Sequence, residues 1–360
     1  MNIILTILIL FVMLSLIIGI HEFGHFITAK KSGVYVDEFS LGMGPAIIKH
    51  KPKNSETTYV IRLFPVGGFV SMAEKEDPDN KEIKPDRVLE NKNFFQKFIV
   101  LIAGIVMNCI LAILLFFISG LIYGKPINDP IVKSVVENKA AALAGIEEGD
   151  RIVKVNGVKV DSWDDFLLEA SAKKAKDSYI FTVKKTNGDI VDYTLVPEVT
   201  KVNGETVRIF GIQSVGTIHK KGFVNALSYG ITGFYDNSRT ILKIVASLFT
   251  GEVSIKNLSG PVGIYSVVDS VKSQGFETLL YLTAYLSINV AIINLIPVPV
   301  FDGGRILLII IEKIIRRKTS DKLETIINYA GFALLILLML YVTFNDIIRL
   351  TVKWKWKIDF

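Results

Sequence analysis

The sequence predicts a polytopic α-helical membrane protein with about four transmembrane helices, a membrane-associated β-hairpin or small sheet, and one inserted α+β domain. Half of the 360 residues are apolar, and the mean hydropathy of +0.44 is higher than that of ordinary soluble chains. Several apolar runs are also long enough to cross a bilayer. Charged residues still make up 21% of the chain, so a substantial part must be exposed to water.

The charge pattern favours a membrane over a nucleic acid as the partner. The net charge is +6, but the basic residues lie beside apolar segments, where they set topology and meet lipid headgroups. We therefore expect contact with the lipid bilayer and no nucleic acid partner. The single cysteine, Cys109, excludes a disulfide framework or a thiolate metal site within one chain.

Residues 1–124 are expected to form an N-terminal membrane part with two spans. The apolar run over residues 3–20 would be about 27 Å long as a helix, which is about one hydrocarbon thickness. It lacks the basic n-region and cleavage site of a signal peptide, so we expect it to be retained. Lys30 and Lys31 follow it and place this end on the cytoplasmic side. In the second span, residues 98–122, Asn108 needs a hydrogen-bonding partner on a neighbouring helix.

The segment between these spans has the composition of strands. Residues 34–72 are rich in β-branched and aromatic side chains and are punctuated by glycine. We interpret residues 57–72 as a β-hairpin close to the membrane. This hairpin either packs against the helices or offers an open edge to which a substrate adds as a strand, and the sequence favours neither. Residues 73–97 are expected to form a solvated loop.

The second half of the chain divides into three parts. Residues 125–200 have short apolar runs separated by turn signals at Asn156-Gly157 and Asn187-Gly188, which predicts a small α+β domain. Residues 201–276 are expected to hold an amphipathic helix at 222–250 that lies on the membrane, and then a loop at 257–263. Residues 277–360 form a C-terminal membrane part with spans at 277–301 and 329–344. Four spans place both termini outside, although three lysines in the C-terminal tail run against the positive-inside rule.

A candidate metal site closes the first span, where His21-Glu22-Phe23-Gly24-His25 forms the pattern H-E-x-x-H. On a helix, both imidazoles point from one face and can hold Zn²⁺, with Glu22 beside the metal as a general base. Lone histidines are more often packing or surface residues. Three ionisable groups clustered in a membrane segment, however, are functional by default.

A third zinc ligand is needed, because a catalytic zinc takes about three protein ligands and an open water position. Asp302 follows a span that two prolines break, and non-helical backbone at membrane depth is tolerated only where it is buried in protein or lines a wet cavity. Glu252, Glu312 and Glu324 are alternatives, but none of them combines a broken membrane helix with the depth of the histidines.

Taken in order, these motifs resemble the site-2 protease family of intramembrane zinc metalloproteases, in its bacterial branch of the RseP and RasP type. The resemblance covers nearly the whole chain. It rests on H-E-x-x-H at the end of the first span and on four further segments: FPVGGFV at residues 64–70, AAALAGIEEGDRIVKVNG at 140–157, NLSGPVG at 257–263 and NLIPVPVFDGG at 294–304. The segment at 140–157 resembles a PDZ domain, so the inserted domain is expected to be PDZ-like.

The resemblance implies a role for each site residue. His21, His25 and Asp302 would hold zinc, Glu22 would be the catalytic base, and Asn294 would contact the substrate backbone or the developing oxyanion. Three departures from the family pattern stand out: phenylalanine replaces leucine before Asp302, isoleucine replaces proline at residue 105, and only one PDZ-like unit fits between residues 125 and 200.

The resemblance also implies the substrates and the location. The expected substrates are single-span membrane proteins cleaved within the bilayer, such as anti-sigma factors trimmed by an upstream site-1-type protease, or remnant signal peptides. The chain would lie in a bacterial inner membrane, with the active site toward the cytoplasm and the PDZ-like domain outside.

Two other functions are compatible with parts of the sequence. A non-catalytic PDZ adaptor with structural zinc would need a fourth ligand, and neither remaining histidine, His50 or His219, lies in a span. A metal transporter could use intramembrane histidine and aspartate, but the sequence lacks inverted repeats, and transport does not explain Glu22.

Overall fold

The structure is a computed structural model, and it describes residues 3–73, 83–170, 178–202, 205–250, 260–317 and 319–358. The chain divides into two compact units. One comprises residues 1–119 and 226–360 and holds the membrane helices, and the other comprises residues 120–225. Each unit is described by itself below.

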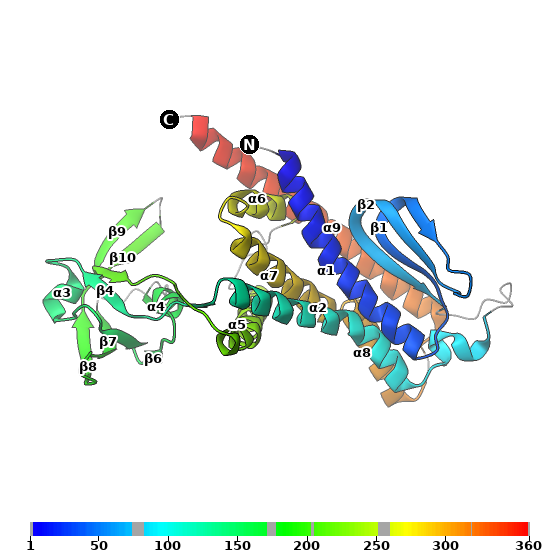
Figure 1. Cartoon of the computed structure of the whole chain (residues 1–360), viewed down its shortest axis with the longest axis horizontal. Coiled ribbons are helices and arrows are strands. Elements are labelled where there is room, and N and C mark those ends of the chain that lie inside the picture. Colours follow the sequence, from blue (N-terminus) through cyan, green and yellow to red (C-terminus); the bar gives the residue numbers. More distant parts are fainter. Residues whose placement is uncertain are drawn as a thin grey trace. The chain divides into compact units, whose positions relative to one another are not determined.

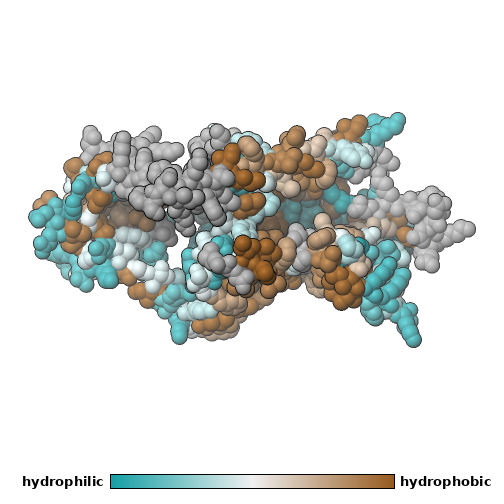
Figure 2. Space-filling model, turned by 90° about the horizontal axis from the view of Figure 1, so that it is seen from above, coloured by the Kyte–Doolittle hydropathy of each residue, from teal (hydrophilic) through white to brown (hydrophobic). Residues whose placement is uncertain are grey.

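Among the described residues, four helices are long and apolar enough to cross a membrane: α1 (Ile3–Lys31), α2 (Phe94–Ile122), α7 (Phe276–Leu295) and the part Thr325–Arg349 of α9 (Asp321–Ile358). Many of their apolar side chains are exposed, as lipid-facing side chains are, and Figure 2 shows hydrophobic residues gathered on the surface. The predicted polytopic helical membrane fold is confirmed.

The described part of this unit also contains the α-helices α5 (Phe223–Phe249), α6 (Pro261–Val271) and α8 (Asp302–Ile315), and the short 3-10 helices η1 (Pro85–Arg87) and η2 (Leu89–Asn91). α5 covers the expected amphipathic segment and is not one of the four candidate spans. The loop expected at residues 257–263 is in part a helix, because Pro261 takes the first position of α6, where its missing N–H costs nothing. Residues 257–259 lie outside the described part of the chain.

The small sheet beside α1 differs from the expected hairpin at residues 57–72. It is formed by β1 (Val36–His50) and β2 (Thr58–Met72), and each of these strands bends. Residues 36–41 pair with 68–72 on one side and lie beside 58–61 on the other, so 58–64 and 68–72 do not pair with each other. Gly42, Gly44 and Gly67 have positive φ angles at the bends, which side chains disfavour. Figure 1 shows this sheet lying along α1.

The break after the third span places Asp302. α7 ends at Leu295, short of the expected residue 301, because Pro297 and Pro299 cannot donate helical hydrogen bonds. The chain turns and α8 begins at Asp302, where an acidic side chain suits the positive end of the helix. A side chain at Gly303 would lie 2.3 Å from the Leu295 carbonyl oxygen, so the tight return requires glycine.

The second unit, residues 120–225, contains the domain that the sequence predicts to be PDZ-like. Its strands and helices are β3 (Lys125–Ile127), β4 (Val132–Val135), α3 (Ala140–Ala144), β5 (Arg151–Val155), β6 (Val158–Lys159), α4 (Trp163–Ala170), β7 (Tyr179–Lys184), β8 (Ile190–Leu195), β9 (Glu198–Val202), β10 (Glu205–Ile209), β11 (Ile212–Ser214) and β12 (Ile218–Lys220). This domain extends beyond the expected boundary at residue 200, because β11 pairs with β4 and β12 pairs with β3. The main sheet has the order β6-β5-β7-β8 and packs on a core that includes Ile152, Phe166 and Phe181.

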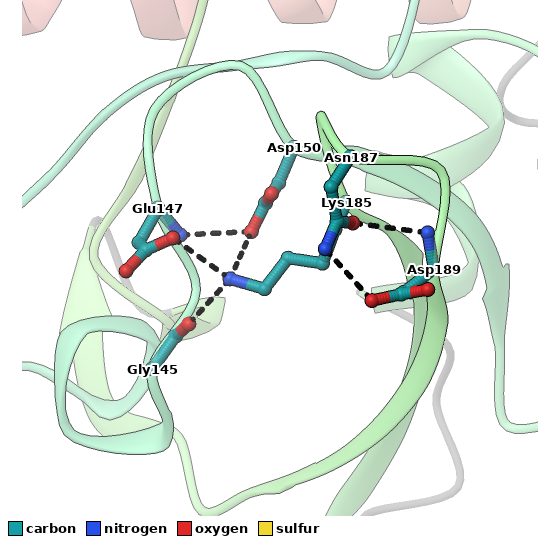
Figure 3. A network of polar contacts seen from close by, with 6 residues as sticks. All are labelled: Gly145, Glu147, Asp150, Lys185, Asn187 and Asp189. Atoms are coloured by element: carbon teal, nitrogen blue, oxygen red, sulfur yellow. Dashed lines mark hydrogen bonds and ion pairs between the residues drawn. The ribbon is translucent and has the colours of Figure 1, made fainter.

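A partly buried ion pair joins the loop after α3 to the end of β7 in this domain (Figure 3). Lys185 Nζ donates to the Asp150 carboxylate at 3.1 Å, to Glu147 at 3.1 Å and to the Gly145 carbonyl at 2.9 Å. The Asp150 side chain is only 1% exposed. Burial opposes the charge on Lys185, but these carboxylates outweigh burial and raise the pKa of its ammonium group.

Replacing Lys185 by methionine should destabilise the PDZ-like domain by about 3–5 kcal/mol, because the Asp150 carboxylate would stay buried without a counter-ion. Hydrogen exchange of β5 and β7 in the full-length protein measures this loss. The neighbouring Lys184 is exposed, so Lys184→Met should change the stability by less than about 0.5 kcal/mol. Equal protection in the two variants would contradict the prediction.

Candidate metal centre

The two histidines of H-E-x-x-H lie on the buried face of α1. His21 and His25 are 7% and 6% exposed, and Gly24 between them is also buried. The helical period brings the two rings to one side, with their centroids 4.8 Å apart. A side chain at Gly24 would lie 2.5 Å from the Ala103 carbonyl oxygen, so glycine lets α1 approach α2 closely at this level.

Asp302 meets both histidines from the start of α8. Its Oδ2 lies 3.1 Å from His21 Nε2 and 3.3 Å from His25 Nε2, and the two nitrogens are 3.2 Å apart. Zinc bonds of about 2.0–2.1 Å in a tetrahedral arrangement place neighbouring ligand atoms about 3.3 Å apart. Asp302 Oδ2 is buried and has no hydrogen-bond partner of good geometry. These three side chains therefore fit a shared zinc ion, and they are the metal-binding group found among the described residues.

Groups on α2 orient the two imidazoles. His25 Nδ1 lies 2.7 Å from the Val100 carbonyl oxygen, to which it donates, and this leaves the Nε2 lone pair toward Asp302. The Asn108 side-chain amide lies 3.4 Å from His21 Nδ1, and Ser287 Oγ donates to the Asn108 backbone carbonyl. The expectation that Asn108 bonds to a neighbouring helix is thus confirmed. The atom recorded nearest His21 is Asn108 Nδ2, and Oδ1 is buried without a partner; turning the amide over would point Oδ1 at His21 Nδ1 and hold that ring in the same tautomer.

Gly104 leaves room for a metal between the two histidines. A Cβ at this position would lie 2.5 Å from His25 Nε2 and 2.7 Å from His21 Nε2. The sequence offered only a weak signal for this role, namely a glycine four residues before Asn108 in an apolar helix. Which face of α2 meets the histidines depends on packing between helices.

A cavity of about 240 Å³ opens beside the cluster. Its lining includes His21, Glu22, Asn294 and Asp302, together with apolar side chains of α1 and α7 and Val300 of the turn before α8. Asn294 therefore shares a cavity with the histidine pattern. Glu22 also lies beside the sheet, because a Cβ at Gly68 would lie 3.3 Å from Glu22 Cγ.

Of the alternative ligands, the structure describes the side chain of Glu312, which is not part of this cluster. Glu312 accepts a hydrogen bond from the Thr319 backbone near the other end of α8. Glu252 lies outside the described residues, as does the side chain of Glu324. His50 ends β1, and His219 lies in β12 of the PDZ-like unit.

The chain is similar to known metalloproteases. The sequence matches peptidase family M50 over residues 9–338. It is 32% identical to the zinc metalloprotease RasP of Bacillus licheniformis, over 97% of this chain and 100% of that protein. It is also 32% identical to the regulator of sigma-W protease RasP of Bacillus subtilis, over 96% of this chain and 99% of the relative.

A putative zinc metalloprotease of Clostridium acetobutylicum is 36% identical, over 93% of this chain and 95% of that protein. Among solved structures, the PDZ domain of an SdrC-like protein from Listeria innocua matches 25% of this chain and 98% of its own length, at 24% identity and a TM-score of 0.21. The chain belongs to peptidase family M50, as a metalloprotease of the site-2, RasP type.

Proposed function

We propose that this chain is an intramembrane zinc endopeptidase that cleaves the transmembrane segments of single-span membrane proteins. The observation that carries the proposal is the convergence of His21, His25 and Asp302, with Glu22 beside them, on one cavity among apolar helices. His21, His25 and Asp302 would hold the metal. Bound zinc would supply a Lewis acid and a water whose pKa falls toward about 7.

The residues around the cavity have distinct roles in this mechanism. Glu22 takes the proton from the attacking water and later delivers it to the leaving amine. Asn294 lines the same cavity, where its amide donates to the substrate backbone or to the developing oxyanion. Val100 and Asn108 hold the imidazoles in position, so the ligand geometry exists before the substrate arrives.

The sheet beside α1 supplies a place for an unwound substrate. A transmembrane helix hides its carbonyl groups in hydrogen bonds, so the scissile segment must first become extended. Residues 68–72 pair with 36–41 on one side, and Gly68 lies next to Glu22. An extended segment that adds along this strand would gain backbone hydrogen bonds close to the catalytic base.

The setting of the reaction follows from the same proposal. The active site lies toward the cytoplasm of a bacterial inner membrane, and the PDZ-like domain lies outside, where it admits substrates already trimmed by a site-1-type protease. The name of the Bacillus subtilis relative, regulator of sigma-W protease, supports membrane-anchored anti-sigma factors as a substrate class. Remnant signal peptides are a second class.

Metal removal tests the proposed function. Purified protein in detergent is given a single-span peptide, with and without a zinc chelator, and the products are mapped by mass spectrometry. We expect cleavage inside the span, loss of cleavage with the chelator, and recovery when zinc is restored. Long and trimmed versions of the peptide in the same assay test the filter role of the PDZ-like domain. Chelator-insensitive cleavage, or cleavage only outside the span, would overturn the proposal.

A further inference from the structure

A second cavity lies away from the metal centre, where the end of α8 meets the start of α2. Its volume is about 290 Å³. Figure 1 shows α8 beside the first turns of α2, and Leu101 and Ile105 of α2 pack with Ile306 of α8 in one hydrophobic cluster. Because α2 is a candidate span that begins at Phe94, the cavity lies at the end of a membrane helix, the depth at which lipid headgroups lie.

Basic side chains dominate the lining of this cavity. Lys97, Lys313, Arg316 and Arg317 contribute four positive charges, and Glu312 contributes one negative charge. A Glu312 carboxylate oxygen already accepts a hydrogen bond from the Thr319 backbone. The cavity therefore carries a net positive charge. The positive-inside rule explains basic residues on this side of the membrane, but it does not require them to gather in one cavity.

The backbone at the end of α8 is arranged around this cavity. Arg316 has φ of 55° and ψ of 31°, a left-handed conformation that residues other than glycine and asparagine seldom adopt. Both Arg316 and the following Arg317 line the cavity. Lys313 is held over the rings of Phe94 and Phe95, with its Nζ 3.9 and 4.7 Å from their centroids.

Apolar side chains are exposed directly beside these charges. Ile314 and Ile315 precede Arg316 and are 74% and 64% exposed, and Phe95 is 67% exposed. A soluble anion would gain nothing from these side chains, whereas the acyl chains of a lipid would cover them. Positive charge inside a cavity with an apolar border is the pattern that suits a molecule with an anionic head and an apolar tail.

We propose that this cavity binds the phosphate headgroup of an anionic phospholipid, with Lys97, Arg316 and Arg317 as the main contacts. Basic pockets between transmembrane helices are a known way for proteins to hold such headgroups. The site is separate from the metal centre, because Asp302 begins α8 and the basic residues end it, about 20 Å away along the helix.

Lipid titration of the purified full-length protein tests the site. The protein in a zwitterionic detergent is titrated with dioleoylphosphatidylglycerol, dioleoylphosphatidylcholine or glycerol 3-phosphate, and bound molecules are counted by native mass spectrometry. We expect one tightly bound phosphatidylglycerol and no comparable binding of the other two. Equal binding of phosphatidylcholine would overturn recognition of the anion. Equal binding of glycerol 3-phosphate would overturn the assignment to a lipid.

Charge-removing variants locate the site. Arg316→Gln combined with Arg317→Gln should weaken phosphatidylglycerol binding roughly 25-fold, because each basic residue near an anionic surface contributes about a fivefold factor. Lys97→Gln, which leaves α8 intact, should weaken it about fivefold and serves if the double variant does not fold. The matched control removes two exposed charges elsewhere, Lys49→Gln with Lys51→Gln, and should bind like the wild type. Unchanged affinity in Lys97→Gln, or an equal loss in the control, would overturn the proposal.

Discussion

Replacing Gly104 by alanine is expected to abolish metal binding and cleavage together. The added methyl group would lie 2.5 Å from His25 Nε2 and 2.7 Å from His21 Nε2, in the space between the two imidazoles. His25 cannot easily turn away, because its Nδ1 is tied to the Val100 carbonyl oxygen at 2.7 Å. We therefore expect the zinc content, measured by elemental mass spectrometry, to fall from about one ion per chain to background.

The same substitution at Gly19 is a matched control. Gly19 lies in α1, one helical turn or less from His21, but a methyl group there meets only the end of the Leu41 side chain, at 3.2 Å. Gly19→Ala should keep both zinc and activity. Thermal unfolding of both variants separates a lost metal site from a lost fold. A Gly104→Ala protein that binds a full equivalent of zinc would show that the metal does not lie between these nitrogens.

Replacing Glu22 by glutamine should separate metal binding from catalysis. Glu22 lines the cavity beside the metal-binding group but is not one of its three members. Glutamine keeps the shape of the side chain and removes the proton acceptor, so the cleavage rate should fall about 10²–10⁴-fold while the zinc content stays at the wild-type level. Single-turnover cleavage of a transmembrane peptide measures the rate.

Asp302→Asn is the informative comparison for this variant. Asp302 contacts both histidines, so its substitution should lower zinc affinity as well as activity. If Glu22→Gln lost zinc, Glu22 would be a ligand rather than a base. If the Glu22→Gln protein cleaved at the wild-type rate, the proton acceptor would have to be another residue of the cavity.

The features visible in the sequence are those that depend on neighbours along the chain. His21 and His25 share a face because the helical period is local. The four spans are visible because length and apolar composition decide whether a helix can cross a bilayer. The end of α7 is visible because Pro297 and Pro299 cannot continue a helix. Asp302 could be selected from the sequence as the candidate third zinc ligand because it follows that break.

Long-range packing decided the remaining features. Residues 36–41 lie between two segments of β2, an order that no local pattern encodes. The PDZ-like unit extends past residue 200, because β11 and β12 pair with strands far back in the chain. Gly104 and Asn108 lie in an apolar run, and only the rotation of α2 against α1 shows that they face the histidines. By itself, the sequence determined the family motifs, the spans and the candidate ligands, because these depend on local order. Only the tertiary structure decided how three helices close around one metal-sized space, because contacts between distant segments set that geometry.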